Sequence, residues 1–168
     1  DIGIQALTIH GRTRAQMYKG EADWSLIREI KRNPRIKIPI FGNGDVNSIE
    51  KAANWRMEYE VDGIMIGRAA IGYPWIFREI KHFFKTGEHL PEPTITERVE
   101  VCKTHLDKSI AWKGPKVGIF EMRRHYSNYF KGIPDFKEYR MKLVSLENID
   151  HIHEVLQEIN ERFQTEMA

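Results

Sequence analysis

The stretch at 38–45, Ile-Pro-Ile-Phe-Gly-Asn-Gly-Asp, decides the fold, because a short apolar segment runs directly into a glycine-bearing loop. The same plan occurs earlier at 6–11, Ala-Leu-Thr-Ile-His-Gly, and later at 61–68, Val-Asp-Gly-Ile-Met-Ile-Gly-Arg. Helical patterns follow these three strands at 24–33, 48–57 and 74–85. Strands that alternate with helices of this length predict β/α units around a parallel sheet.

The strands of this sheet are apolar throughout, which is typical of strands covered on both faces. Asp23 is the expected N-cap of the helix at 24–33. Three β/α units cannot close a barrel, and their outer strands would leave unpaired edges. The chain also begins at Asp1-Ile2, without an initiator Met and already in the lead-in to a strand. We expect a fragment of a longer protein; the alternative is a processed or tag-cleaved complete protein.

The pattern changes after residue 86. Residues 87–95 contain Gly87, Pro91 and Pro93 and read as a linker. Residues 96–168 then carry only helical periodicities, interrupted at Gly114-Pro115 and at 132–134. Short connections between amphipathic helices predict a small helical bundle as a second domain.

Composition excludes several classes of protein. The chain has 168 residues, 41% hydrophobic and 30% charged, and no apolar run approaches the roughly eighteen residues of a membrane span. The single cysteine, Cys102, allows no internal disulfide, which is typical of the cytoplasm, and its place on an apolar helix face predicts a core position. The histidines lack metal-ligand spacing, so we expect no metal site.

Charge is unevenly distributed. The net charge is +2, but residues 98–142 hold eleven Lys and Arg against five Asp and Glu, whereas residues 143–168 hold one against six. A basic stretch attracts phosphates, although a solvated helical surface without a partner has the same composition. Within it, Arg123 and Arg124 are expected outside the helix core or at its edge, with Lys116 and Lys131 near them in sequence, as in a track for an RNA backbone. Five aromatic residues could stack bases, but such a set is more often core: Trp112, Phe120, Tyr126, Tyr129 and Phe130.

Three loops follow the strand ends, where α/β barrels bind ligands. His10 ends the first strand. Arg12 and Arg14 follow it, and their planar guanidinium groups present paired donors suited to phosphate. The loops at 42–45 and 67–72 bear glycines that let the backbone approach a ligand, and Arg68 adds a permanent charge. Taken singly, each loop is explained by ordinary turn and cap chemistry. Together they match the phosphate site after strands seven and eight of a TIM barrel, which makes residues 1–86 strands six to eight.

Several motifs resemble those of bacterial tRNA-dihydrouridine synthases, especially the nitrogen-regulator-like branch. In the β/α part they are LTIHGRTR at 7–14, GEADW at 20–24, GNGD at 42–45, IGRAA at 66–70 and PWIF at 74–77. In the helical part, MRRH at 122–125, with Tyr129 and Lys131-Gly132 after it, resembles the family's helical domain. The resemblance covers nearly the whole chain.

The resemblance implies an FMN-dependent enzyme that uses NADPH to reduce the C5–C6 bond of uridines in tRNA, with flavin N5 passing hydride to uracil C6. It also implies a general-acid cysteine that protonates C5, together with an active-site lysine, both upstream of this segment. Cys102 does not match that cysteine. We therefore expect the longer protein to be an oxidoreductase and this chain alone to be inactive.

The family's binding roles carry over to matching positions. His10 matches a histidine that contacts the flavin ring. Asn43, Gly44 and Asp45 match the loop that holds the FMN phosphate and ribityl chain, and Gly67 and Arg68 match its partner loop. The arginines at 12 and 14 match positions beside the uridine pocket and tRNA. Expected tRNA contacts on the helical domain are Lys116, Arg123, Arg124 and Lys131.

Two other functions remain open at this point. The His10 and phosphate loops also suit an FMN-barrel oxidoreductase that acts on a small molecule. The helical part alone also suits a non-catalytic RNA-binding module.

Overall fold

The structure, a computed structural model, describes residues 3–164. Within these residues the chain forms two compact units. The first, here the β/α unit, comprises the residues up to Ala70 and Pro74–Leu90. The second, the helical unit, comprises Ile71–Tyr73 and the residues from Pro91 onward. Asp1 and Ile2, expected to lead into a strand, and the last four residues of the expected helical domain lie outside the described part.

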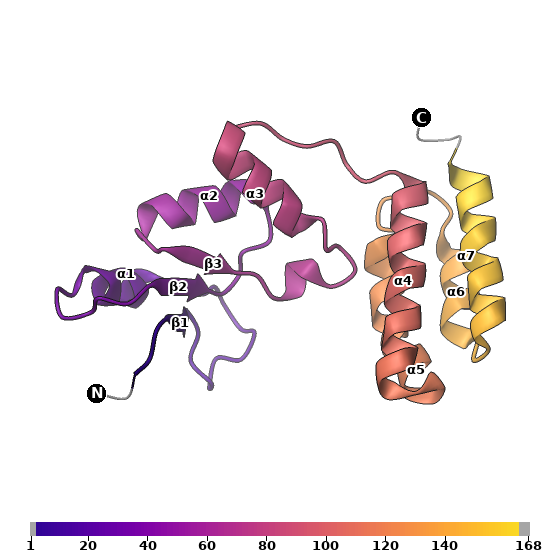
Figure 1. The fold of residues 1–168 in the computed structure, drawn as a ribbon, viewed down its shortest axis with the longest axis horizontal. Coiled ribbons are helices and arrows are strands. Elements are labelled where there is room, and N and C mark those ends of the chain that lie inside the picture. Colours follow the sequence, from indigo (N-terminus) through magenta and orange to yellow (C-terminus); the bar gives the residue numbers. More distant parts are fainter. Residues whose placement is uncertain (1–2, 165–168) are drawn as a thin grey trace. The chain divides into compact units, whose positions relative to one another are not determined.

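The β/α unit contains a three-stranded parallel sheet in the order β1 (Leu7–His10), β2 (Ile40–Asn43) and β3 (Gly63–Met65) (Figure 1). The connecting helices are α1 (Ser25–Arg32) and α2 (Ile49–Glu58), and α3 (Ile76–Thr86) follows the last strand. His10 pairs in register with Asn43, and Asn43 with Met65, so the three strands end at one edge of the sheet. The predicted parallel β/α arrangement is confirmed for these three strands, and it places the three strand-end loops together.

Packing in this unit centres on Trp24, which is almost fully buried. Its indole contacts the rings of Trp55 and Tyr59 on the α2 side, with centroids 4.7 and 5.5 Å away. The indole N–H donates to the Gly44 carbonyl at 3.2 Å. The same side chain therefore fills the core and supports the loop that follows β2.

Some details differ from the sequence-based expectations. Trp24, not Asp23, occupies the N-cap position of α1, and the Asp23 carboxylate instead accepts from the Ser25 N–H at 2.9 Å. The second strand begins at Ile40 rather than at residue 38; the Ile40 N–H donates to the Asp62 carboxylate at 2.7 Å. In this chain one face of β1 and the end of β3 are not covered, because Thr8, His10 and Met65 are exposed.

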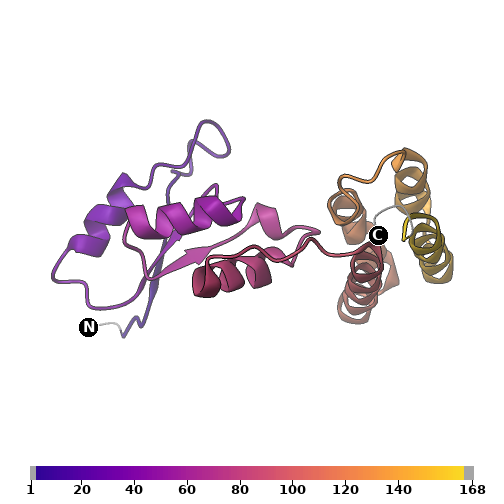
Figure 2. The same ribbon diagram turned by 90° about the horizontal axis from the view of Figure 1, so that it is seen from above.

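The helical unit contains α4 (Ile95–Lys113), α5 (Pro115–Tyr129), α6 (Lys137–Ser145) and α7 (Ile149–Phe163), which Figure 2 shows nearly end-on. Thr94 begins α4 with a capping box to Glu97, and Pro115 occupies the first turn of α5, as the break at 114–115 predicts. Among the described residues no helix is both long and apolar enough to cross a membrane. The fully buried core of the unit includes Val99, Cys102, Leu106, Met122, Tyr126, Leu143, Ile152, Leu156 and Ile159.

The aromatic set of this unit divides into two groups. Tyr126, Tyr129 and Phe130 are buried, as expected for core residues. Trp112 and Phe120 are exposed, so the core interpretation is wrong for these two. Their exposure leaves large apolar surfaces in water on α4 and α5.

Candidate functional site

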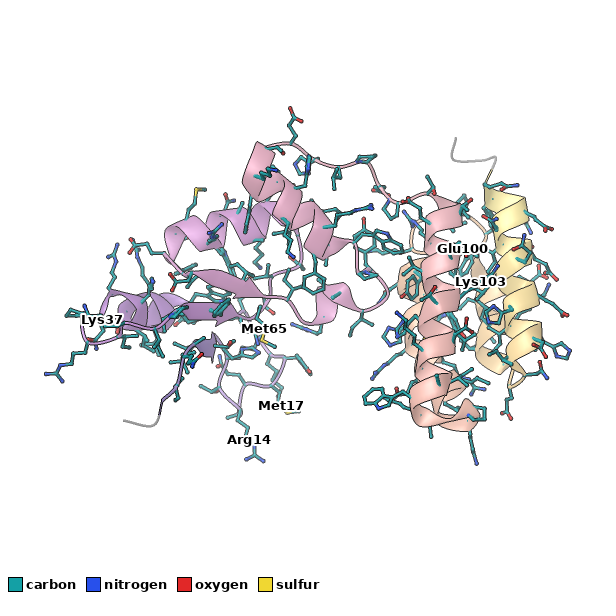
Figure 3. The ribbon with its side chains drawn as sticks, viewed as in Figure 1. Arg14, Met17, Lys37, Met65, Glu100 and Lys103 are labelled. Atoms are coloured by element: carbon teal, nitrogen blue, oxygen red, sulfur yellow. The ribbon has the colours of Figure 1, made fainter. Side chains whose placement is uncertain are left out.

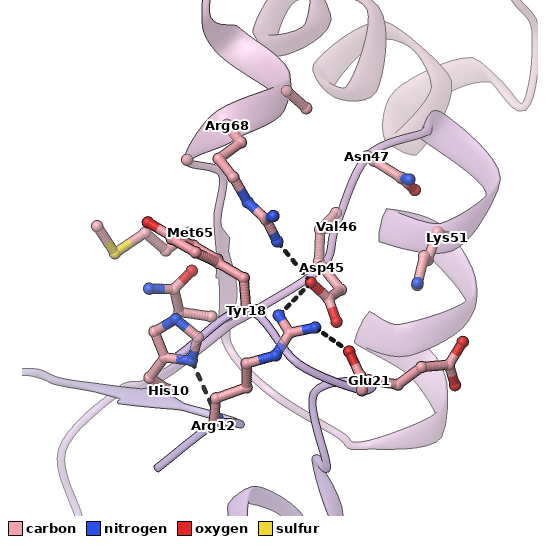
Figure 4. Close-up of a pocket in the computed structure, with 15 residues that line it drawn as sticks. His10, Arg12, Tyr18, Glu21, Asp45, Val46, Asn47, Lys51, Met65 and Arg68 are labelled. Carbon is pink, nitrogen blue, oxygen red and sulfur yellow. Dashed lines mark hydrogen bonds and ion pairs between the residues drawn. The ribbon is translucent and has the colours of Figure 1, made fainter. Parts of the chain in front are cut away.

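Three loops meet at the edge where the strands of the β/α unit end (Figure 4). The loop after β1 continues the sheet pairing for one residue, because the Gly11 N–H donates to the Asn43 carbonyl at 2.8 Å. The loop after β3 forms a 3₁₀ turn at Arg68–Ala70. Parallel strands in register thus bring together loops that lie more than twenty residues apart in sequence.

Asp45 is the centre of this site. Its Oδ1 atom accepts hydrogen bonds from the Arg12 guanidinium and from Arg68 Nη2, the latter at 2.8 Å. Its Oδ2 atom accepts from the Ala22 N–H at 2.8 Å. A single carboxylate therefore fixes one arginine from each of the other two loops, together with the segment that leads into α1.

The two arginines differ in exposure. The Arg12 side chain is only 6% exposed, and its second amino group donates to the Gly20 carbonyl. Arg68 is 57% exposed, and its guanidinium lies 4.7 Å from the centroid of the Tyr18 ring. Arg12 therefore supports the site from within, whereas Arg68 keeps donors available at the surface of the pocket.

The protonation state of Asp45 follows from these contacts. Burial raises the pKa of the Asp45 carboxyl. The hydrogen bonds from Arg12 and Ala22 and the charges of Arg12 and Arg68 lower this pKa by a larger amount, so the net shift is downward. Asp45 is thus a carboxylate at neutral pH. Its charge offsets one of two nearby cations, so the three side chains together carry +1.

Backbone conformation makes this arrangement depend on Gly44. Its φ of 126° is disfavoured for residues with a side chain, and a Cβ atom there would lie 2.7 Å from the Ala22 Cβ. Asp45 follows with a φ of 55°, a left-handed conformation that Asp tolerates better than most residues. The Gly44-Asp45 pair therefore turns the loop so that the carboxylate faces Arg12 and Arg68.

His10 lies at the end of β1 beside this network. Its Nδ1 atom accepts from the Arg12 backbone N–H at 3.1 Å. In the neutral ring, this bond places the proton on Nε2, which is then a hydrogen-bond donor.

These groups line a pocket of about 670 Å3. That volume lies within the roughly 300–1,000 Å3 of small-molecule and cofactor sites. The charged lining consists of three cations, Arg12, Lys51 and Arg68, and two carboxylates, Glu21 and Asp45. The predicted residues that line it are His10, Arg12, Asn43, Gly44, Asp45, Gly67 and Arg68.

Arg14 does not line this pocket. Figure 3 shows its side chain pointing away from the sheet at the tip of the loop after β1, near Met17. Tyr18 and Lys51 also line the pocket, although neither belongs to the residues predicted from the sequence. Lys51 could have been found, since it lies in the first turn of the helix that follows the 42–45 loop, whereas no sequence signal indicates Tyr18.

The predicted cations of the helical unit lie in varied surroundings. Lys116 and Arg124 line a second, smaller pocket on α5, and Lys131 is exposed beyond the end of that helix. Arg123 packs its guanidinium 4.0 Å from the centroid of the Phe120 ring and lies 3.7 Å from the Glu147 carboxylate. Arg98, counted in the basic stretch, is buried and donates to the carbonyls of Pro93 and Lys131, so it adds nothing to a basic surface.

Cys102 is fully buried, as predicted, and burial strongly raises the pKa of its thiol. A thiol in this environment does not exchange protons with a ligand. Within residues 3–164 no cluster of three metal-ligating side chains is present.

Comparison with known proteins gives a consistent result. The family model described as dihydrouridine synthase matches residues 1–168. The tRNA-dihydrouridine synthase B of Pseudomonas putida is 46% identical over 146 residues, which are 87% of this chain and 43% of that protein. The protein of the same name from Pseudomonas aeruginosa is 43% identical over 148 residues, 88% of this chain and 44% of that one.

A probable tRNA-dihydrouridine synthase of Rickettsia conorii is 40% identical over 138 residues, 82% of this chain and 41% of that protein. The chain thus spans about two fifths of the length of the curated relatives that it matches. Since the family model covers its whole length, the chain belongs to the tRNA-dihydrouridine synthase family.

Proposed function

We propose that this chain supplies the last three β/α units, strands six to eight, and the helical tRNA-binding domain of a flavin-dependent tRNA-dihydrouridine synthase. The observation that carries the proposal is the Asp45–Arg68 contact, which joins two glycine-bearing loops at the ends of neighbouring parallel strands. This is the place where α/β barrels bind phosphate.

The pocket residues suit FMN as the cofactor. Arg68 is held at one edge by Asp45 and keeps exposed donors for a phosphate. The first turn of α2, through Lys51, adds a second cation at a helix N-terminus, which favours anions. Because both Asp45 oxygens accept from protein donors, Asp45 acts on the phosphate indirectly, by positioning Arg68.

The other end of the pocket suits the flavin ring. His10 presents an Nε2–H donor in the tautomer that its bond from Arg12 selects, and the Asn43 amide can donate and accept. When bound, FMN supplies the hydride chemistry between NADPH and uracil C6. The protein residues orient the ring and hold its phosphate.

The resemblance places Arg12 beside the substrate, but a different role is better supported. Its guanidinium is nearly buried and donates to Asp45 and Gly20. We therefore assign Arg12 to positioning of the loops, and we assign contact with the tRNA to the exposed Arg14 and to Lys116, Arg124 and Lys131.

The general acid must come from outside this chain, because its only cysteine is buried in the helical unit. We therefore propose that the chain alone does not reduce uridine. The function belongs to the longer protein in which these residues are combined with the catalytic cysteine.

A chimera tests the function directly. This chain would replace the matching 146 residues of the Pseudomonas putida relative, in a strain that lacks its own dihydrouridine synthases. We expect a yellow, FMN-containing protein and restored dihydrouridine in tRNA, measured by mass spectrometry of nucleosides. A folded chimera that neither retains FMN nor changes tRNA uridine would refute the proposal, and one that retains FMN but leaves tRNA unchanged would favour a small-molecule substrate.

A further inference from the structure

Trp112 is an unusual feature of the helical unit because it is 81% exposed. Trp24 and Trp75, in the β/α unit, are buried, and Trp55 is half-buried. Two further apolar residues, Val117 and Phe120, are 50% and 42% exposed. Scattered exposed apolar residues need no explanation, whereas a cluster marks an interaction surface.

Close packing of α4 against α5 places the end of one helix beside the start of the other. Gly118 faces Ile110 so closely that a Cβ atom there would lie 2.7 Å from the Ile110 backbone. The Ser109 hydroxyl donates to the Gly118 carbonyl at 3.3 Å. The end of α4, which carries Trp112, therefore lies against the first turns of α5.

Next to this contact is a pocket of about 410 Å3 lined by Lys116, Val117, Phe120, Glu121 and Arg124. Lys113 links it to the indole. Its ammonium lies 4.5 Å from the centroid of the Trp112 ring and 2.5 Å from Glu121 Oε2. Trp112 does not itself line the pocket, but Lys113 connects its ring to Glu121, which does. Trp112, this pocket and Phe120 are here called the Trp112–Phe120 patch.

The charge around the patch favours an anionic partner. Four cations, Lys113, Lys116, Arg123 and Arg124, surround it, against two carboxylates, Glu121 and Glu147. In the described part of the chain, Lys116 and Arg124 form no salt bridge with a carboxylate, so their charges are available to a ligand.

Exposed aromatic rings flanked by cations are the chemistry that binds unpaired nucleotides. Bases stack on the rings while the cations neutralise the backbone phosphates, and RNA proteins recognise splayed single-stranded bases in this way. An uncharged membrane or an apolar protein surface would not use the excess of cations, and a second copy of this chain would bring like charges together.

We propose that the Trp112–Phe120 patch binds an unpaired nucleotide of RNA, with its base stacked on Trp112 and its phosphates bound by Lys116 and Arg124. This inference deepens the proposed function, since it rests on tRNA being the partner of the helical unit. It also assigns a binding role to two aromatic residues that their apolar character alone would place in the core.

The test measures how the 168-residue chain binds three labelled probes by fluorescence anisotropy: a short oligouridine, an abasic ribose-phosphate oligomer of the same length, and tRNA. The abasic probe has the same backbone charge but no base to stack. The variants are Trp112→Ala, Trp112→Phe, which keeps an aromatic face, and the matched control Met141→Ala at another exposed apolar position.

We expect wild type to bind oligouridine more tightly than the abasic oligomer. Trp112→Ala should weaken oligouridine binding roughly five- to hundredfold, the range for loss of one stacked base, and leave abasic binding unchanged. Trp112→Phe should retain most of the affinity, and Met141→Ala should match wild type. Because Trp112 is already exposed, its replacement should leave the fold intact, as circular dichroism would verify.

Equal binding of the two oligomers by wild type, or equal oligouridine binding by wild type and Trp112→Ala, overturns the stacking site. A dimer that becomes monomeric in Trp112→Ala also overturns it and identifies a self-association surface. The tRNA probe separates the two proposals. Oligouridine binding through Trp112 without any tRNA binding contradicts only the tRNA assignment, whereas tRNA binding with no effect of Trp112→Ala on any probe contradicts only the stacking site.

Discussion

The β/α unit uses arginine to build a polar site, whereas the helical unit keeps most of its arginines at the surface, with the buried Arg98 as the exception. In the β/α unit, the carboxylate of Asp45 holds Arg12 inside the protein and Arg68 at the pocket surface. In the helical unit, Arg123 and Arg124 lie on the outside of a helix whose inner face is apolar. The first unit thus builds a preorganised polar site, and the second builds an apolar core that carries most of its cations on its surface.

This difference predicts which kind of substitution destabilises each unit. A polar network fails when one partner is removed, because the remaining charge is left without compensation. An apolar core fails when volume is removed. Hydrogen exchange measured peptide by peptide separates these two kinds of failure by unit.

The largest expected effect is on the helical core. Leu106 is fully buried, so Leu106→Ala should destabilise the helical unit by about 4 kcal/mol through lost burial and the cavity left behind. Exchange should accelerate in peptides of α4 and α5 and remain unchanged in the β/α unit. Leu26→Ala, the same change at an exposed position of α1, is the control and should have little effect. Equal acceleration in both units would contradict the division into separate cores.

The second effect is on the polar network. Asp45→Ala leaves Arg12 nearly buried without its carboxylate and should destabilise the β/α unit by about 3 kcal/mol. Peptides of the loops at 11–24 and 42–48 should exchange faster while α4 to α7 stay protected. Arg32→Ala, which breaks the exposed pair with Glu60, is the matched control and should cost less than about 1 kcal/mol. If Asp45→Ala and Arg32→Ala lose the same stability, the Asp45 network contributes no more than an exposed ion pair.

The third effect depends on pH and acts on the helical unit. Burial, then the charges of His105 and Arg124, lower the pKa of His125 to about 4, and Glu121 offsets this only in part. The unfolded chain therefore binds a proton between pH about 6.5 and 4 that the folded chain does not. Stability of the helical unit is complete above the unfolded pKa and should fall by about 2 kcal/mol as pH drops through this window, after allowance for partial solvent exposure.

Urea unfolding followed by hydrogen exchange at pH 7 and pH 5 measures the part of this loss that falls above pH 5. His125→Gln should remove most of it. The β/α unit should differ, because the pKa of Asp45 is lowered: its contribution persists above the unfolded value near 3.9 and is lost only as pH falls through the lower folded value. A β/α unit that weakens first between pH 7 and pH 5 would be inconsistent with this assignment.

The sequence predicted most of the framework, because strand and helix periodicities and glycine-bearing loops are local signals. The break at Pro115 and the burial of Cys102 were both anticipated. The loops at 42–45 and 67–72 do meet, which follows from parallel strands in register. These features depend on the residues themselves and on a sheet whose strands end together.

What the sequence did not reveal depends on tertiary contacts. Arg12 looks like a free phosphate ligand until the fold places it against Asp45 and Gly20. Tyr18 reaches Arg68 from a loop that has no periodicity. Trp112 and Phe120 have the apolar character of core residues, and only the placement of α4 against α5 shows that they face outward.

The central claim is that Arg68, held by Asp45, binds the phosphate of FMN. Its most direct test compares the FMN affinity of the chimera with that of its Arg68→Ala and Arg35→Ala variants. Arg68→Ala should raise the FMN dissociation constant about tenfold, the cost of losing a charge-assisted hydrogen bond. Arg35→Ala changes an exposed arginine between α1 and β2 that does not line the pocket and should leave the constant unchanged. If the two variants bind FMN equally well, Arg68 does not hold the phosphate and the account of the site is wrong.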